Sequence, residues 1–387
     1  MAKGVCIQTI SLWEQTRIHL SCVMFGLWVV FKRLVKWLCN PTSKRNFTVR
    51  DSPPSCLIDS SLGQHKYIKI KGVKFHYVEC GNKDQPLLLL LHGFPDFWLG
   101  WRYQIPILSV NFRVVALDLK GFGDSDKPVW RNNYRLDTIL EELREFIYSL
   151  GVNNCIVIGH DLGGLLGWYL THHLPSLVTK FFVIASPHPN YYWKTFNKTG
   201  PYECIKFVHL PYLPEIDIKN NDKIIDQYYS HLVAKDMQLE AYKYTFCRKE
   251  DWSGPINYYR NLAFSKIDDE REIAVPVIVI YGSNDKVVDL RGVVKSTEFC
   301  THFRIKIVDG CGHFPHQENP EAFNNILLKY LSEPKTNKNT AEPHSTRLLN
   351  GFLGAVSNTV KYGTSVIGTV QKKTNGVVNS IPTFSSK

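Results

Sequence analysis

The sequence predicts an α/β fold in which a mostly parallel sheet is flanked by helices. Residues 86–91 read Pro-Leu-Leu-Leu-Leu-Leu, an apolar run without alternation, as expected for a strand that is buried on both faces. Residues 136–150 carry apolar side chains at spacings of three and four, which is typical of an amphipathic helix. Such runs alternate between about residues 68 and 332, and this alternation indicates parallel strands joined by helices.

The remaining strands are predicted by apolar runs of similar length. Residues 73–80 alternate between apolar and polar side chains, which is typical of a strand at a sheet edge. Further buried strands are expected at residues 112–117, 155–158, 181–185, 275–281 and 303–308. With 387 residues, of which 44% are hydrophobic, the chain is long enough to bury a full core.

The net charge of +11 lies at the two ends of the chain. Residues 1–50 contain eight basic residues and one acidic residue, and residues 335–387 contain seven basic residues and one acidic residue. The stretch between them has 31 basic and 33 acidic residues, so its net charge is −2. A basic globular surface that binds nucleic acid is therefore excluded as the main interpretation.

The N-terminal end contains a charge-free apolar run at residues 18–31, followed by Lys32, Arg33 and Lys36. The run is shorter than the roughly 20 residues that cross a bilayer, and no small-residue cleavage site follows it. We expect residues 1–50 to form an uncleaved membrane anchor and linker, which either spans the bilayer or lies in its interface. The alternative is a helix packed on the globular domain. The basic residues favour a cytoplasmic position for the main domain.

The C-terminal end, residues 335–387, has a different pattern. Between residues 356 and 377 valine and isoleucine recur at helical spacings among polar residues, and three lysines accompany them. Such a stripe becomes ordered on a lipid surface, where lysines favour anionic head groups. We interpret this end as a basic, lipid-binding amphipathic tail; a disordered tail is the alternative.

Cysteine spacing predicts neither a zinc site nor a disulfide scaffold. None of the ten cysteines forms a Cys-x-x-Cys pair, and most lie in apolar runs, where a reduced cysteine behaves as a small hydrophobic residue. The sequence therefore calls for no metal and no cofactor.

A nucleophile elbow is predicted directly after the strand at residues 155–158. Gly159-His160-Asp161-Leu162-Gly163 matches the pattern Gly-x-nucleophile-x-Gly, in which small residues allow a turn sharp enough to expose the middle side chain. Here the middle residue is Asp161 in place of serine. A carboxylate nucleophile attacks a saturated carbon and leaves an alkyl ester on the enzyme, which disfavours carboxylic esters and amides as substrates. The alternative is a glycine-rich turn with a solvated aspartate.

Two further candidates follow later strands. Asp285 ends the sequence Gly-Ser-Asn-Asp after the strand at 275–281, and His313 ends Gly-Cys-Gly-His after the strand at 303–308. The chain order nucleophile, acid, histidine is that of the α/β-hydrolase fold. In this arrangement His313 is the general base, and Asp285 holds its tautomer and stabilises the imidazolium.

Backbone N–H groups of two residues are candidates for an oxyanion hole. Phe94 follows the leucine-rich strand in His92-Gly93-Phe94-Pro95, and Leu162 begins the helix after the elbow. At these positions both groups are expected to point at the tetrahedral intermediate of ester hydrolysis.

These motifs together resemble a known family. In chain order they are His92-Gly93-Phe94-Pro95-Asp96-Phe97-Trp98, Trp101-Arg102-Tyr103-Gln104, Asp118-Leu119-Lys120-Gly121-Phe122-Gly123-Asp124-Ser125, Gly159-His160-Asp161 and Cys311-Gly312-His313. They resemble the epoxide hydrolases of the α/β-hydrolase fold, most of all the membrane-anchored animal branch. The resemblance implies a hydrolase core in residues 65–185 and 269–332, interrupted by a helical lid at 186–268.

The family's lid carries two tyrosines that hydrogen-bond the epoxide oxygen. Residues 257–261 match the family's aromatic-Tyr-Arg-Asn pattern, so the resemblance assigns Tyr259 as a proton donor. The position expected for the other tyrosine holds Cys204, and Tyr202 lies two residues away. Either Tyr202 is the second donor or Tyr259 works alone. Leu162 stands where many relatives have tryptophan, a residue that related dehalogenases use to hold halide.

The predicted function is hydrolysis of lipophilic epoxides, such as epoxy fatty acids, to vicinal diols through an alkyl ester on Asp161. This makes the chain an ether-bond hydrolase of lipid metabolism, with membrane lipid as its other partner and the endoplasmic reticulum as its expected location. One alternative is a haloalkane-type dehalogenase. Another is a catalytically weak lipid-surface protein of the same fold.

Overall fold

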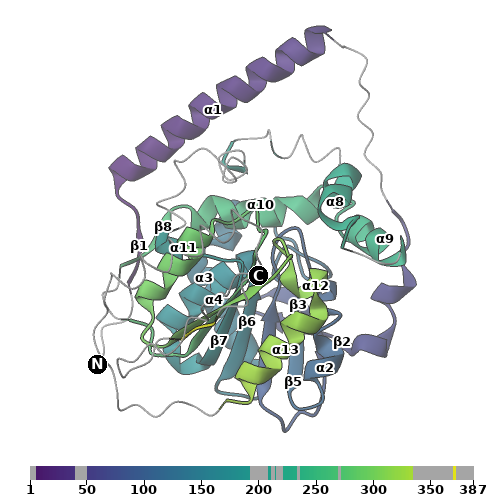
Figure 1. The fold of residues 1–387 in the computed structure, drawn as a ribbon. Helices are drawn as coiled ribbons and strands as arrows, with labels where there is room; N and C mark the ends of the chain where they lie inside the picture. The colour runs from purple at the N-terminus through teal and green to yellow at the C-terminus, as the bar shows by residue number, and fades with distance from the viewer. Residues whose placement is uncertain are drawn as a thin grey trace, which may run out of the picture.

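A nine-stranded sheet lies at the centre of the molecule, in the order β11-β10-β9-β7-β6-β4-β5-β3-β2 (Figure 1). The five pairs between β5 and β10 are parallel, and the pairs at both edges are antiparallel. The predicted fold class, a mostly parallel sheet flanked by helices, is confirmed. The computed structural model describes residues 6–39, 50–191, 208–210, 214, 221–232, 236–268, 272–333 and 369–371.

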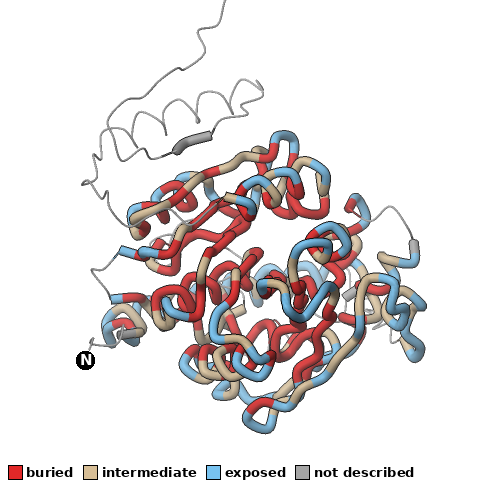
Figure 2. Tube along the Cα trace, turned by 90° about the horizontal axis from the view of Figure 1, so that it is seen from below, coloured by how far each residue is buried: buried red, intermediate tan, exposed pale blue. Residues whose placement is uncertain are grey.

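The strands of the sheet are β2 (Gln64–Ile70), β3 (Val73–Cys80), β4 (Leu87–Leu91), β5 (Arg113–Leu117), β6 (Cys155–His160), β7 (Val178–Ile184), β9 (Val277–Gly282), β10 (Phe303–Val308) and β11 (Thr369–Gln371). All residues of β4, β5 and β9 are buried, because helices cover both faces of these central strands. Figure 2 shows buried residues concentrated in the interior of the molecule and exposed residues toward the outside. The apolar runs therefore predicted the inner strands correctly.

The expectation that residues 73–80 form an edge strand is wrong. β3 lies between β2 and β5, so the edge belongs to β2, which the sequence did not single out. Two polar residues of β3 are buried with partners: His76 Nδ1 lies 2.7 Å from Asp118 Oδ2, and Glu79 Oε1 accepts a hydrogen bond from Arg113. Of the polar residues in this strand Lys74 is exposed, whereas His76 and Glu79 are buried with partners, so alternation by itself does not mark an edge strand.

The helices of the hydrolase core flank the sheet, and a separate group lies above it in Figure 1. The core helices are α2 (Ile105–Leu108), α3 (Leu136–Ser149), α4 (Asp161–His173), α11 (Leu290–Lys295), α12 (Pro315–Glu318) and α13 (Pro320–Leu331). Helix α4 is buried along almost its whole length, as an all-round apolar helix requires. It contacts β4, β6 and β7, and these contacts hold the start of the helix against the centre of the sheet.

Among the described residues between β7 and β9, three helices cover the carboxyl ends of the parallel strands. They are α8 (Asn221–Tyr229), α9 (Asp236–Thr245) and α10 (Glu250–Leu262) (Figure 1). All three lie in the range predicted to form the lid. Two asparagine side chains of α10 donate to backbone oxygens of the core, Asn257 to Val129 and Asn261 to Arg131. Helix α10 is therefore tied to the core by polar contacts.

The N-terminal segment forms a strand and a long helix. β1 (Cys6–Thr9) pairs antiparallel with β8 (Ser265–Asp268), which follows α10. Helix α1 (Leu12–Cys39) then extends for 28 residues, and only 17% of its apolar 18-residue window is buried. Ser11 and Glu14 form a reciprocal capping box at its start. The predicted N-terminal apolar helix is thus present, with most of its apolar surface exposed.

One face of α1 packs on the lid. Ile18, Cys22 and Gly26 are buried, and the ring of His19 stacks on Phe264 at 5.2 Å between ring centroids. The space beside Gly26 is filled by Leu210, since a Cβ there would lie 2.8 Å from Leu210 Cδ2. Together with the β1–β8 pair, these contacts attach the N-terminal segment to the lid and not to the sheet.

The predicted C-terminal tail lies almost entirely outside the described residues. The part that the structure describes, Thr369–Gln371, pairs antiparallel with β10 as strand β11. Residues 1–5 and 40–49 of the predicted anchor and linker also lie outside the described residues.

A buried ion pair joins α3 to the loop after β5. Lys120 Nζ lies 2.7 and 2.6 Å from the two carboxylate oxygens of Glu142, and both side chains are at most 4% exposed. Burial raises the pKa of Glu142 and lowers the pKa of Lys120, while each charge opposes the shift of the other. Desolvation thus makes each charge depend on its partner.

We predict that Glu142→Gln lowers the free energy of unfolding by about 3–5 kcal/mol, because it leaves the Lys120 ammonium buried without a counter-charge. The double variant Lys120→Met/Glu142→Leu should lose much less, since it removes both charges. Urea unfolding followed by circular dichroism measures both values. Equal losses in the single and double variants would contradict a dominant role for desolvation.

Candidate active site

Asp161 lies at the turn between β6 and α4, where the sequence predicts the nucleophile elbow. Its φ angle is +45°, a left-handed conformation that costs a non-glycine residue about 1–3 kcal/mol. The turn is tight enough to require glycine two residues later, because a Cβ at Gly163 would lie 2.2 Å from the carbonyl oxygen of Leu91. The strained turn leaves the Asp161 side chain 17% exposed at the end of the buried sheet.

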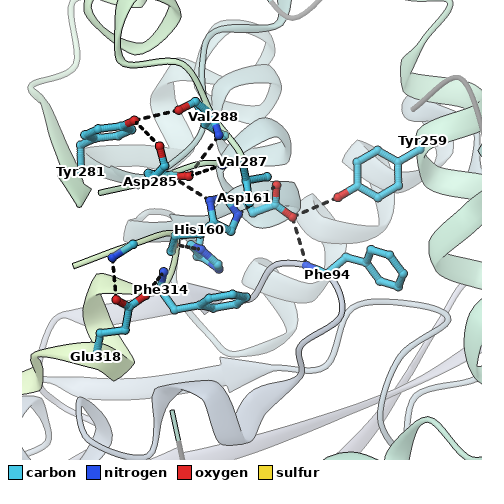
Figure 3. Close-up of polar contacts among 12 residues, drawn as sticks. Phe94, His160, Asp161, Tyr259, Tyr281, Asp285, Val287, Val288, Phe314 and Glu318 are labelled. Atoms are coloured by element: carbon cyan, nitrogen blue, oxygen red, sulfur yellow. Dashed lines mark hydrogen bonds and ion pairs between the residues drawn. The ribbon is translucent and has the colours of Figure 1, made fainter. Parts of the chain in front are cut away.

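Two hydrogen bonds converge on one oxygen of the Asp161 carboxylate (Figure 3). The backbone N–H of Phe94 donates to Oδ2 at 3.1 Å, and the hydroxyl of Tyr259 donates to the same oxygen at 3.0 Å. The other oxygen, Oδ1, lies 3.8 Å from His313 Nε2. One carboxylate oxygen is therefore fixed by donors, while the other faces the imidazole.

The imidazole of His313 is oriented from behind by Asp285. His313 Nδ1 lies 2.9 Å from Asp285 Oδ2, and the Asp285 side chain is fully buried. Asp285 Oδ1 accepts two backbone hydrogen bonds, from Val287 at 2.7 Å and from Val288 at 3.1 Å. Because a carboxylate accepts at Nδ1, the proton of neutral His313 belongs on Nδ1, and Nε2 is left as the acceptor that faces Asp161.

The charge around His313 favours its protonated form. Burial by itself lowers the pKa of the imidazole, but the carboxylates of Asp285, Asp161 and Glu318 outweigh burial, and the pKa of His313 is raised above its ordinary 6.5. A histidine in this position accepts a proton readily from a nearby water.

The two candidate oxyanion donors come from the loop after β4 and from the start of α4. Phe94 presents its N–H directly to Asp161, as described above. Leu162 is buried as the second residue of α4, and the N–H groups in the first turn of a helix have no partner within the helix. The sequence-predicted site residues Asp161, His313, Asp285, Phe94 and Leu162 are thus brought together at one end of the sheet.

Tyr259 reaches the site from helix α10 of the lid. The next residue, Arg260, donates to the carbonyl oxygens of Val208 and Leu210, so this part of α10 also holds the segment at 208–210. Tyr202, the predicted second donor, lies outside the described residues, as does Cys204. Its role stays a prediction.

Aromatic side chains pack around Phe94, whose backbone N–H contacts Asp161. The ring of Phe94 contacts Trp252 at 5.8 Å, Tyr259 at 5.9 Å and Phe122 at 6.3 Å between ring centroids. These rings form an apolar cluster next to two residues that donate hydrogen bonds to the carboxylate. The surroundings are therefore suited to an apolar molecule that presents one hydrogen-bond acceptor to Tyr259.

Comparison with known proteins identifies the family. Residues 86–203 match the family model for the alpha/beta hydrolase fold. The chain is 36% identical to epoxide hydrolase 4 of Homo sapiens over 309 residues, which are 75% of this chain and 84% of that protein. The chain belongs to the epoxide hydrolase family. Epoxide hydrolase 3 of Xenopus tropicalis is 33% identical over 76% of the chain and 84% of that protein.

Solved epoxide hydrolases share the fold of this member of the family. The enzyme from Bacillus megaterium in complex with an inhibitor is 28% identical, with a TM-score of 0.62, over 69% of this chain and 100% of that chain. An epoxide hydrolase from Vigna radiata is 25% identical, with a TM-score of 0.62, over 69% of this chain and 97% of that chain. Membership of the family makes this chain a hydrolase.

Glu318 is a contributor to this epoxide hydrolase's site that sequence reasoning missed. It lies on α12, and its carboxylate accepts the backbone N–H groups on both sides of His313, from Gly312 at 2.5 Å and from Phe314 at 3.0 Å (Figure 3). It thereby fixes the histidine loop and adds negative charge near the imidazole. No motif marks it, because its position five residues after His313 is meaningful only once the loop folds back.

A buried group behind the site contains metal-binding residue types. Among the described residues, Asp96, His160 and His316 have donor atoms within 4.8 Å of one another. Both oxygens of Asp96 already accept hydrogen bonds, and the positive charge of Arg102 acts on both Asp96 and His316. This group therefore suits a hydrogen-bond network better than a cation.

We predict that the hydrolase activity declines as the pH falls through a midpoint above 6.5, because His313, if it is the general base as predicted from the sequence, cannot take a proton from water once it is protonated. Glu318→Gln should move this midpoint to lower pH, since it removes one of the charges that raise the pKa of His313. Steady-state rates measured across pH test both statements.

The matched control is Glu321→Gln, which removes the same charge from an exposed position in the first turn of α13. Its midpoint should equal that of the wild type. A common midpoint for the Glu318 and Glu321 variants would contradict the role assigned to Glu318.

Proposed function

We propose that the chain hydrolyses lipophilic epoxides to vicinal diols through a covalent alkyl ester on Asp161. The observation that carries the proposal is the arrangement around that carboxylate. Tyr259 and Phe94 both donate to Oδ2, and Oδ1 faces His313 Nε2 at 3.8 Å. A hydroxyl donor beside a carboxylate nucleophile is what the opening of an epoxide requires.

In the first step, Oδ1 of Asp161 attacks one ring carbon of the epoxide. The bond between that carbon and the epoxide oxygen breaks, and the oxygen keeps the electron pair. Tyr259, released from Oδ2, donates its hydrogen bond and then its proton to this oxygen. The product of the step is an alkyl ester on Asp161 that carries a neighbouring hydroxyl group.

In the second step, water attacks the carboxyl carbon of Asp161 while His313 takes a proton from it. The negative charge that develops on Oδ2 is stabilised by the N–H of Phe94, which already points at this oxygen, and by the N–H of Leu162. Collapse releases the diol, whose alkoxide takes the proton of the new carboxyl group. The proton on His313 returns to Tyr259, so both groups are restored.

Two observations support the substrate class. The rings of Trp252 and Phe122 pack against Phe94, which contacts the carboxylate through its backbone N–H, and the lid is attached to the apolar helix α1. Both features support a lipophilic epoxide, and epoxy fatty acids are the class that we propose.

We predict that the first turnover in ¹⁸O-labelled water yields an unlabelled diol, because the oxygen added to the epoxide comes from Asp161 and not from water. The experiment uses enzyme in excess over a fatty-acid epoxide and mass spectrometry of the diol and of the peptide that contains Asp161. The peptide should gain the label. Asp161→Ala is the control and should form no diol on this time scale.

Label in the diol of the first turnover would contradict the covalent mechanism. The dehalogenase alternative has its own outcome, which is release of halide from a haloalkane without diol formation from any epoxide of the panel. A protein that produces neither diol nor halide would correspond to the catalytically weak lipid-surface alternative.

Helix α1 supports membrane association of the enzyme, with the endoplasmic reticulum as the proposed compartment. Its exposed face carries large apolar side chains, including Leu20, Leu27 and Phe31, which are 56–62% exposed. Burying such side chains in lipid is favourable by about 1.5–3 kcal/mol each. Its other face packs on the lid, which supports retention of α1 in the mature protein over removal as a signal peptide.

We predict that the triple variant Leu20→Lys/Leu27→Lys/Phe31→Lys moves from the membrane fraction to the soluble fraction, because it adds three charges to the lipid-facing side of α1 and leaves the lid-facing side intact. Fractionation followed by immunoblotting measures the distribution. The control, Ile58→Lys/Ile107→Lys/Val110→Lys, adds the same charges to exposed apolar positions of the body. Retention of both variants in the membrane would contradict anchoring by α1.

A further inference from the structure

Two tyrosines of the lid have no part in the mechanism described above. Tyr229 ends α8 and Tyr242 lies on α9, and both are fully buried. Their rings stack at 3.7 Å between centroids with an angle of 21° between the planes. Tyrosine carries a hydroxyl that needs a partner when buried, so full burial of two tyrosines indicates specific acceptors.

Both hydroxyls donate to the loop that carries Phe94. Tyr229 donates to the carbonyl oxygen of Pro95 at 2.8 Å, and Tyr242 donates to Asp96 Oδ1 at 2.9 Å. Pro95 and Asp96 directly follow Phe94, whose N–H contacts the carboxylate of Asp161. The lid therefore touches the residues next to the oxyanion donor with two hydrogen bonds.

Asp96 also connects this loop to the histidine loop. Its Oδ2 accepts a hydrogen bond from Gln317 Nε2 at 2.9 Å, and Gln317 Oε1 accepts one from Arg102 at 2.7 Å. Gln317 lies on α12, four residues after His313. The carboxylate thus receives donors from the lid and from the helix that follows the general base.

The loop is shaped to hold this carboxylate. A Cβ at Gly100 would lie 2.4 Å from Asp96 Oδ2 and 2.6 Å from Oδ1, so only glycine leaves room for the carboxylate at this position. The Asp96 side chain also accepts the backbone N–H of Phe97 at 2.8 Å. Asp96 is therefore placed by its own loop and completed by side chains from two other parts of the chain.

A carboxylate in this position depends on its donors. Asp96 is fully buried, and burial raises its pKa to about 7 although the donors and Arg102 act in the opposite direction. Loss of a hydrogen bond to a buried charged group is costly, because water cannot replace the donor. The placement of the loop is therefore sensitive to each of these donors.

We propose that Asp96, Tyr242 and Tyr229 are positioning residues that make the N–H of Phe94 available to Asp161 only when helices α8 and α9 are packed on the core. The three residues do not touch the reacting atoms. They act through the loop that carries Phe94. When the lid packs on the core, Tyr242 and Tyr229 donate hydrogen bonds to Asp96 and Pro95, and the loop then holds the N–H of Phe94 beside Asp161. The inference rests on the proposed function, since it assigns the Phe94 N–H to the oxyanion of ester hydrolysis.

The direct test is Tyr242→Phe, which removes the hydroxyl and keeps the ring stacked on Tyr229. We predict that kcat for diol formation falls about tenfold, a part of the 10²–10³ lost when an oxyanion donor is removed outright. KM should change less than twofold, because the residue does not contact substrate. The alkyl-enzyme, trapped by acid quench and detected by mass spectrometry, should accumulate, since its hydrolysis needs the donor.

Tyr244→Phe is the matched control. This tyrosine lies on the same helix, two residues further, is half-buried and has Arg248 on its ring, at 5.8 Å between the guanidinium carbon and the ring centroid. The variant removes the same hydroxyl without touching the Phe94 loop. It should keep the wild-type kcat and the wild-type level of alkyl-enzyme.

Exchanging the hydrogen-bond donor and acceptor between positions 96 and 317 distinguishes a positioning role of Asp96 from a general contribution to stability. Asp96→Asn leaves two NH₂ groups facing each other, that of the new amide and that of Gln317, so we expect a loss in kcat similar to that of Tyr242→Phe. In Asp96→Asn/Gln317→Glu, the amide at position 96 donates to a carboxylate at position 317, which still accepts from Arg102. The double variant should recover at least half of the lost kcat.

Hydrogen exchange of the amides in residues 93–97 tests the inference without using catalysis. Exchange in Tyr242→Phe and Asp96→Asn should be at least about tenfold faster than in the wild type, because each variant loses a buried hydrogen bond of at least 1.4 kcal/mol. Exchange in Tyr244→Phe should be unchanged. This readout stays informative if the wild type forms no diol, in which case the proposed function fails separately.

Two results would overturn the inference. One is unchanged exchange of residues 93–97 in both Tyr242→Phe and Asp96→Asn. The other is a loss of kcat that the double variant does not recover and that Tyr244→Phe shares, which would indicate general destabilisation of the lid.

Discussion

The two hydrogen bonds that meet at Asp161 Oδ2 impose a geometric requirement on the rest of the structure. One donor is a backbone N–H after β4, and the other is a hydroxyl on α10, 98 residues beyond Asp161. Neither is useful unless the carboxylate is held between them. The left-handed turn at Asp161 provides this placement, and its strain is supported by the buried strand before it and the buried helix after it.

The parallel sheet explains why residues so far apart in the chain meet at this carboxylate. The carboxyl ends of the parallel strands β4, β6, β9 and β10 lie at the same end of the sheet. The loops that follow these strands therefore converge there, and they carry Phe94, Asp161, Asp285 and His313. The lid helices cover this end of the sheet (Figure 1). Carboxylates connect the segments around the site: the buried Asp285 lies behind the imidazole, the half-buried Glu318 bridges the histidine loop, and the buried Asp96 lies between the lid and the core.

The N-terminal segment and the lid form a connected unit. β1 pairs with β8 directly after α10, and one face of α1 packs against Leu210 and Phe264. Arg260, next to Tyr259, holds the segment that contains Leu210. The apolar helix is therefore linked through a few contacts to the helix that carries Tyr259, the proposed epoxide donor. These contacts bring the proposed lipid surface and the proposed substrate site to the same side of the molecule.

The sequence by itself determined the central strands, the elbow and the order of Asp161, Asp285 and His313, because burial on both faces and a sharp turn each leave a local pattern of residues. Its error was β3, where His76 and Glu79 are polar and yet buried with partners distant in sequence. The contacts of Glu318, Asp96 and Tyr242 could not be predicted from the sequence either. Tyr242 and Asp96 are partners from distant segments, and Glu318 meets its partners only because the histidine loop folds back, so the local sequence does not reveal these contacts. Only the tertiary structure decided which buried polar side chains are paired, because the stability of a buried charge depends on what surrounds it in space.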